Sequence, residues 1–256
     1  MVWTAAATGA ENPRANRERL EIVFADRTHT PDATLSGVRP RALFVTIGQT
    51  PRSDLVPELR EWLGGRVDIE ERGALDGLGV EAIAAMAPRA GDHRLVTRLA
   101  GGQEVVVRKD LVHTRLQRVF DAAAAEDFLC TVLLCTGHFP AFRIRGLFLE
   151  AQTIVDQSVA AIARNARSIG LMVPLKEQIE EFHFRPDVGQ TLRASYASPY
   201  TPGRLAEASS ELAETDLIVM HCIGYTEAMR QTVASVSKRP VLLARRLVAA
   251  AVAQLA

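Results

Sequence analysis

Short apolar runs alternate with amphipathic stretches from residue 41 to the end of the chain, and this alternation limits the possible folds more than any other feature. Apolar runs of strand length separated by helical patterns are typical of βαβ units, in which helices cover a mainly parallel sheet. The clearest buried strands are expected at 42–47, 168–173 and 217–221. The sequence therefore predicts an α/β protein with mainly parallel sheets.

The remaining elements continue the same alternation of strand and helix patterns along the chain. Further strands are expected at 67–72, at 128–134, at 241–243, as a weaker candidate at 193–196, and as a hairpin of 95–99 with 105–108. Helices are expected at 53–62, 80–87, 110–125, 155–165, 175–184, 205–214, 226–237 and 244–256. Ser53 or Asp54 can cap the first of these helices.

The pattern divides into two similar halves, and we expect two α/β lobes. With 256 residues, 48% of them hydrophobic, the chain can bury a substantial core. We expect a first lobe at 40–143, a second at 144–240, and a final strand and helix at 241–256 that pack back on the lobes. Residues 1–39 show no clear period and are expected to form a flexible extension.

Composition narrows the classes of partner. Lysine plus arginine and aspartate plus glutamate number 30 each, so net charge favours neither nucleic acid nor an anionic membrane as partner. No apolar stretch approaches the roughly 20 residues that span a bilayer, and the N-terminus lacks the apolar segment of a signal peptide. We therefore expect a cytoplasmic protein with a small-molecule ligand. Its oligomeric state, including a homodimer, stays open.

Two of the three cysteines share one placement. Cys135 and Cys222 each end an apolar run and precede a turn, at the strand ends where parallel α/β sheets bind ligands. An odd cysteine count without an export signal favours free thiols. Cysteine is also a common core residue, and for Cys130, in mid-strand, we adopt that interpretation. The matched placement of the other two favours a functional role.

Two thiols suit one kind of chemistry. Moving a proton at a carbon stereocentre needs a base on one face and an acid on the other, with the roles reversed for the opposite enantiomer. A cysteine with a pKa near its reference value of about 8.5 can serve as either. Neighbouring residues that can contact the ligand are Thr136, Gly137, Gly224, Tyr225 and Thr226. The Tyr225 side chain can equally be a buried residue of the hydrophobic core.

The turn after the first strand is a second candidate site. Gly48, Gln49, Thr50 and Arg52 lie between a strand and a helix, where backbone N–H groups and an arginine suit a carboxylate. The alternative is that the turn only starts a helix and that Arg52 is solvated. Because Gly-x-Gly-x-x-Gly is absent, no dinucleotide is expected. No close pair of cysteines or histidines has metal-ligand spacing, so we expect neither a metal nor another cofactor.

The chain resembles the AroM family, within the aspartate/glutamate/hydantoin racemase superfamily. The resemblance covers about residue 41 to the C-terminus and depends most on segments 43–52 (LFVTIGQTPR), 87–91 (APRAG) and 216–225 (DLIVMHCIGY). It implies two similar Rossmann-like lobes with a carboxylate substrate in the cleft between them. In the racemases one cysteine from each lobe faces each side of the substrate's α-carbon, and Cys135 and Cys222 match those positions.

The expected function is that of a cofactor-independent racemase or isomerase, with the two cysteines transferring a proton at a carbon next to a carboxylate. Racemases usually follow their cysteines with Asn-Thr and Thr-His, whereas this chain has Thr136-Gly137 and Ile223-Gly224. The substrate therefore stays open. One alternative is a lyase or decarboxylase that uses a single thiol. The other is a non-catalytic binding protein for an aromatic-pathway carboxylate.

Overall fold

The computed structural model describes residues 39–181 and 190–256. The expected extension at 1–39 therefore lies, apart from Arg39, outside the described residues. The described elements are, in chain order, β1 (Arg41–Thr46), α1 (Val56–Trp62), β2 (Asp68–Gly73), α2 (Val80–Ala84), β3 (Arg94–Arg98), β4 (Glu104–Arg108), α3 (Lys109–Ala123), β5 (Cys130–Leu134), β6 (Phe148–Glu150), α4 (Ala151–Ile162), β7 (Ser168–Val173), α5 (Gln178–Glu181), β8 (Thr191–Tyr196), α6 (Leu205–Glu211), β9 (Leu217–Met220), α7 (Glu227–Ser237), β10 (Val241–Leu243) and α8 (Ala244–Ala253).

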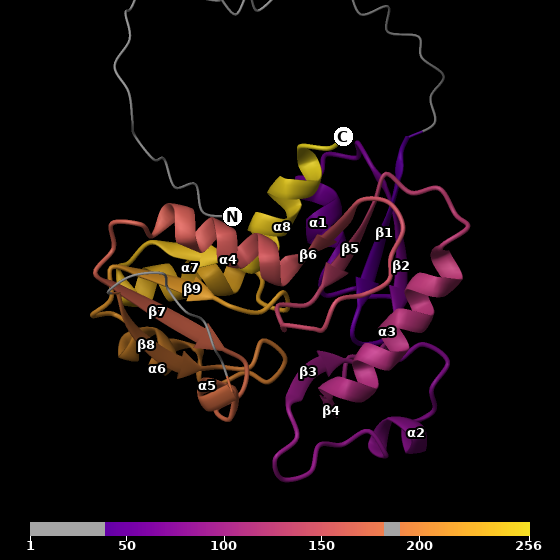
Figure 1. Ribbon diagram of the computed structural model, residues 1–256. Helices are drawn as coiled ribbons and strands as arrows, with labels where there is room; N and C mark the ends of the chain where they lie inside the picture. Colours follow the sequence, from indigo (N-terminus) through magenta and orange to yellow (C-terminus); the bar gives the residue numbers. More distant parts are fainter. Residues whose placement is uncertain (1–38, 182–189) are drawn as a thin grey trace, which may run out of the picture. The chain divides into compact units, whose positions relative to one another are not determined.

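Two parallel sheets with the same connectivity form the two lobes (Figure 1). The first has the strand order β2-β1-β5-β6, and the second has the order β8-β7-β9-β10. In each four-stranded sheet the first strand along the chain lies between the second and the third and is parallel to both. The fourth strand lies at the edge, next to the third. The predicted α/β class with two similar lobes is therefore confirmed.

In each lobe the helix that follows the last strand of the parallel sheet packs on the other lobe. Val155 and Val159 of α4, which follows the first sheet, join a buried cluster with Ile169 of the second sheet. Val248 of α8, which follows the second sheet, packs with Phe44 of the first. The two helices also contact each other (Figure 1). This exchange buries apolar surface of both lobes together and fixes one lobe against the other.

Several element bounds differ from the expectation. The short strand β6 was not predicted, and its pairing with β5 extends the first sheet beyond residue 143. The strand at 241–243 is an integral edge of the second sheet. The expected cap of α1 is wrong: its N-cap is Leu55, without a side-chain cap, because the Asp54 carboxylate accepts hydrogen bonds from Arg52 instead. The part of the helix expected at 182–184 lies outside the described residues.

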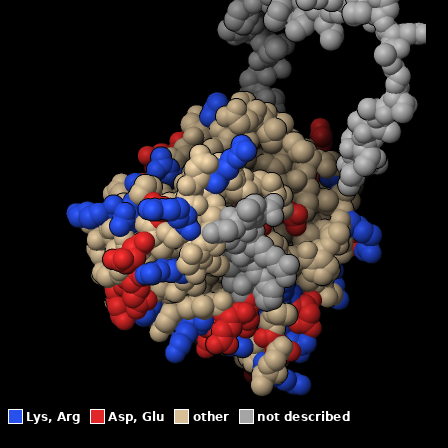
Figure 2. Space-filling view, turned by 60° about the vertical axis from the view of Figure 1, so that its left-hand side comes forward, with Lys and Arg blue, Asp and Glu red and all other residues tan. Residues whose placement is uncertain are grey.

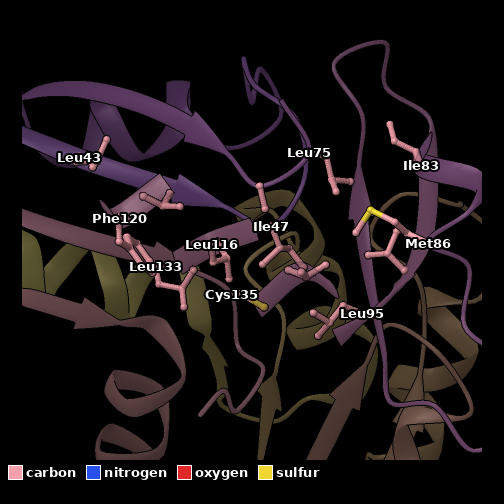
Figure 3. Close-up of a cluster of buried hydrophobic side chains, with 14 of the residues drawn as sticks. Leu43, Ile47, Leu75, Ile83, Met86, Leu95, Leu116, Phe120, Leu133 and Cys135 are labelled. Carbon is pink, nitrogen blue, oxygen red and sulfur yellow. The ribbon is translucent and has the colours of Figure 1, made fainter. Parts of the chain in front are cut away.

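An antiparallel hairpin, β3 with β4, extends the first lobe and leads directly into α3. Leu95 of the hairpin, Leu116 of α3 and Cys135 belong to one buried cluster (Figure 3). The apolar face of the hairpin therefore docks beside the end of β5.

No helix in the part of the chain that the structure describes is long and apolar enough to cross a membrane. Figure 2 shows positive and negative side chains intermingled on the face it presents.

Candidate functional site

Cys135 and Cys222 occupy equivalent positions in the two lobes. In each lobe the third strand runs parallel to the first, and its pairing starts at the second residue of that first strand. Each cysteine lies the same number of residues beyond the start of this pairing, just past the carboxyl end of β5 or β9. The shared connectivity therefore carries both thiols to corresponding strand ends.

The two cysteine loops have similar local structure and are joined to each other. The backbone N–H of Gly224 donates to Sγ of Cys222 at 3.4 Å, and the N–H of Gly137 makes the corresponding contact to Cys135. The hydroxyl of Thr136 donates to the carbonyl oxygen of His221 at 3.2 Å, across the lobes. Each sulfur thus lies in a turn that offers it an N–H group.

Both thiols line one pocket of about 350 Å³. Its walls come from the strand ends of both lobes, from the hairpin and from the start of α3. The polar and charged lining residues are Arg52, His93, Arg94, Thr97, Lys109, Thr136, His138, Gln178, Glu181, Tyr200 and His221. A pocket of this size suits a small organic molecule.

The structure brings five of the eleven candidate residues to this pocket: Arg52, Cys135, Thr136, Gly137 and Cys222. The other six do not line it, and their described contacts are internal. In the first turn, the N–H of Gly48 donates to Thr46 at 3.2 Å and that of Gln49 donates to Arg98 at 3.2 Å. Both the N–H and the hydroxyl of Thr50 donate to the Asp76 carboxylate at 2.8 Å. The N–H groups expected to bind a carboxylate are therefore already used.

The candidates in the second lobe also have structural contacts. Tyr225 is fully buried and its hydroxyl donates to the carbonyl of Ala197 at 2.6 Å. Thr226 caps α7 by accepting from the N–H of Met229 at 3.2 Å. A Cβ atom on Gly224 would lie 2.5 Å from the hydroxyl oxygen of Tyr200, so only glycine fits there without movement. These residues shape the wall behind Cys222.

Arg52 is a buried cation at the pocket wall, with an exposed fraction of 2%. Its guanidinium binds the Asp54 carboxylate through two hydrogen bonds of 2.8 Å. It also donates to Thr46 at 2.7 Å and to the hydroxyl of Tyr200 at 3.1 Å. Burial by itself lowers the pKa of Arg52, but the Asp54 contacts raise it above the ordinary value, so the side chain stays charged.

Burial raises the pKa of both pocket thiols, to about 12 for Cys135 and about 11 for Cys222. Nearby cations act in the opposite direction: Lys109 and Arg52 lower the pKa of Cys135, and Arg52 lowers that of Cys222. The charge of an ionised Cys222 raises the pKa of Cys135 further. The pocket therefore disfavours two thiolates at once, and burial keeps both thiols protonated at neutral pH.

Two histidines line the pocket on either side of Asp156. Nε2 of the buried His221 lies 3.9 Å from the Asp156 carboxylate, and Nε2 of the exposed His138 lies 3.7 Å from it. The side chain of Gln152 contacts both Asp156, at 2.7 Å, and His221, at 3.3 Å. Burial lowers the pKa of His221, while Asp156 raises it. This polar group lies at the junction of α4 with both cysteine loops.

Sequence reasoning did not select Lys109 or Tyr200. Tyr200 follows β8 by a few residues, in a stretch with little periodic signal, and Lys109 reads as an ordinary charge at the start of a helix. For His138 and His221, the only sequence signal for a place in the site was their nearness along the chain to the two cysteines.

Cys130 is 1% exposed and packs within the first sheet, as expected for a core residue. Among the described residues, no group of three or more His, Cys, Asp or Glu side chains can hold a metal.

Several solved structures share this fold. Picrophilus torridus aspartate racemase matches with a TM-score of 0.54 at 9% identity, over 84% of this chain and 93% of that one. The maleate isomerase Iso from Pseudomonas putida matches with a TM-score of 0.51 at 11% identity, over 85% and 92%. A Nocardia farcinica maleate cis-trans isomerase variant with a covalently bound succinylcysteine intermediate matches with a TM-score of 0.52 at 14% identity, over 85% and 93%.

At these identities the likeness establishes the two-lobe fold of racemase-like proteins. A search of curated proteins found no match. The family model described as AroM protein matches residues 43–256, which include every described element from the second half of β1 onward. On this match the chain belongs to the AroM protein family.

Proposed function

We propose that this protein catalyses cofactor-independent proton transfer at a carbon next to a carboxylate, in a racemisation or a related isomerisation. Cys135 and Cys222 act as the acid/base pair. One observation carries the proposal: the two thiols lie at equivalent positions of the two lobes and line the same pocket. An acid and a base on opposite faces of a reacting carbon need this kind of arrangement.

The proposed reaction conserves protons. A thiolate on one side takes the α-proton, and the electron pair of the C–H bond moves into the carboxylate as an enolate. The thiol on the other side then gives its proton to the opposite face of the carbon. Each turnover therefore exchanges the roles of the two cysteines. Because the charge of one sulfur raises the pKa of the other, ionisation of one thiol keeps the second one protonated, as this step requires.

Tyr200 and Arg52 provide a polar wall near Cys222. The hydroxyl oxygen of Tyr200 accepts a hydrogen bond from Arg52, which leaves the tyrosine proton to be donated to another group. Both side chains line the pocket. A hydrogen bond from Tyr200 to the oxygen of an enolate would stabilise the charge that develops as the proton leaves.

A second candidate is chemistry at a single thiol, as in a lyase or decarboxylase. Two buried arginines, Arg52 and Arg245, lower the pKa of Cys222, whereas Cys135 has the higher pKa of the two. In the similar Nocardia farcinica isomerase variant, the intermediate is covalently bound as a succinylcysteine. The lower pKa favours Cys222 as the thiol that would act alone, and the covalent intermediate supports chemistry at a single cysteine in this fold.

The test is solvent deuterium incorporation, followed by mass spectrometry, into a panel of α-amino, α-hydroxy and aromatic-pathway carboxylic acids. Wild type is compared with Cys135→Ala and Cys222→Ala, and Cys130→Ala is the matched control because that cysteine is equally buried but lies outside the pocket. We expect exchange at the α-carbon of at least one acid, about a hundredfold slower or worse in either pocket variant and unchanged in the control.

Other outcomes of this experiment distinguish the alternative functions. Dependence on Cys222 alone would favour the single-thiol reaction. If no acid exchanges but one raises the melting temperature of wild type, the protein is a binding protein and the proposed reaction is wrong.

A further inference from the structure

The charges around the pocket are mostly balanced within the protein. Four lining side chains of basic type lie beside a carboxylate: Arg52 beside Asp54 at 2.8 Å, Arg94 beside Glu181 at 2.7 Å, and His138 and His221 beside Asp156 at 3.7 Å and 3.9 Å. Lys109 also lines the pocket, but it forms no ion pair with any described carboxylate. Lys109 is therefore the pocket lysine whose charge lacks an adjacent partner in the described part of the chain.

The fold holds Lys109 in place from both sides. It is the first residue of α3, directly after β4, and its backbone N–H donates to the carbonyl of His93 at 3.0 Å. Its Nζ atom lies 5.7 Å from the centroid of the Phe139 ring, which follows the Cys135 loop. The half-buried side chain thus extends from the hairpin toward the loop that carries the first thiol.

The surroundings of Lys109 leave room for a ligand anion. Burial lowers the pKa of its ammonium group, and only the more distant charges of Cys135 and Glu181 raise it. A cation that loses water without gaining a partner is unfavourable, and a bound carboxylate would remove that cost. The turn after β1 cannot supply this contact, because Thr46, Asp76 and Arg98 already accept its N–H groups.

We infer that Lys109 binds the carboxylate of the pocket's ligand. This inference rests on the proposed function for the identity of the acid, but the binding contact does not require catalysis. A carboxylate at Lys109 would lie on the Cys135 side of the pocket. The ligand class is a small organic monoacid or diacid that fits about 350 Å³.

Binding is measured by isothermal titration with succinate and phenylacetate, each beside its uncharged amide, on the full chain. The variants are Lys109→Met, Lys109→Gln and Lys109→Arg, and Lys238→Met is the charge-matched control because Lys238 ends α7, outside the pocket. We expect the acids to bind better than the amides. Affinity should fall at least about tenfold in the Met and Gln variants and stay largely intact in the Arg and control variants.

A second series separates direct contact from an effect through Cys135. In the Cys135→Ala background, Lys109→Met should still weaken acid binding by a similar factor. The inference is overturned if neither acid binds wild type, if the amides bind as well as the acids, or if the loss disappears without Cys135. The proposed function fails separately: it is wrong if acids bind through Lys109 but no deuterium is exchanged.

Discussion

The hydroxyl of Thr136 donates a hydrogen bond of 3.2 Å to the main-chain carbonyl of His221. Thr136 follows Cys135, and His221 precedes Cys222, so this single bond joins the two cysteine loops across the lobes. The two sulfurs are therefore positioned relative to each other by a direct contact as well as by the shared sheet geometry.

Replacing Thr136 by valine should loosen this connection. We expect a loss of about 1 kcal/mol in the free energy of unfolding, because one hydrogen bond is removed and the His221 carbonyl loses a partner. Denaturant unfolding measures the loss. Thr136→Ser, which keeps the hydroxyl, is the control. Equal stability of the valine and serine variants would contradict the structural role of the bond.

Arg245 should be essential for the Cys222 loop. It is fully buried and donates to the carbonyls of Ile223 and Gly224 at 3.0 Å and to the Glu58 carboxylate at 2.6 Å. Arg245→Met leaves these acceptors unpaired and should lower the free energy of unfolding by about 3–5 kcal/mol. Arg246→Met, at an exposed neighbouring position, should change it by less than about 0.5 kcal/mol. Similar melting temperatures for the two variants would rule this role out.

Gly224→Ala should distort the wall behind Cys222. The new Cβ atom would lie 2.5 Å from the Tyr200 hydroxyl oxygen and 2.9 Å from a side-chain atom of Pro199, so the tyrosine must move. We expect a loss of roughly 1–3 kcal/mol in stability and reduced deuterium exchange. Gly101→Ala, where a Cβ meets nothing within 4 Å, serves as the control. The prediction fails if both alanine variants behave like wild type.

The two pocket thiols should make stability fall at alkaline pH. Burial raises their pKa from 9.0 to about 12 for Cys135 and about 11 for Cys222, so the unfolded chain loses these protons first. Their contribution is complete below pH 9.0 and is lost as pH rises toward 11 to 12. The double variant Cys135→Ala/Cys222→Ala should therefore show a shallower fall of melting temperature above this pH than wild type. Cys130 is present in both proteins, so its contribution cancels. Parallel curves would contradict the prediction.

Much of the fold follows from local pattern. The bounds of β7 agree with the expected 168–173, because a mostly apolar run between turn residues specifies a buried strand without help from distant contacts. The bounds of the short edge strand β10 also agree with the expected 241–243. The strand β6 escaped prediction, since its three residues are only partly buried and pairing with β5 alone makes them a strand.

By itself, the sequence determined the alternation of strands and helices, the two similar halves and the position of Cys135 and Cys222 just beyond apolar runs. Tertiary structure alone decided which polar groups stand beside them. The N–H groups of the first turn were unavailable because Asp76 and an Arg98 carbonyl, distant in the chain, accept their hydrogen bonds. Lys109 and Tyr200 line the pocket only because the hairpin and the loop after β8 pack beside the two cysteine loops. Strand periodicity is a local property, whereas the partners of a side chain depend on how distant segments pack.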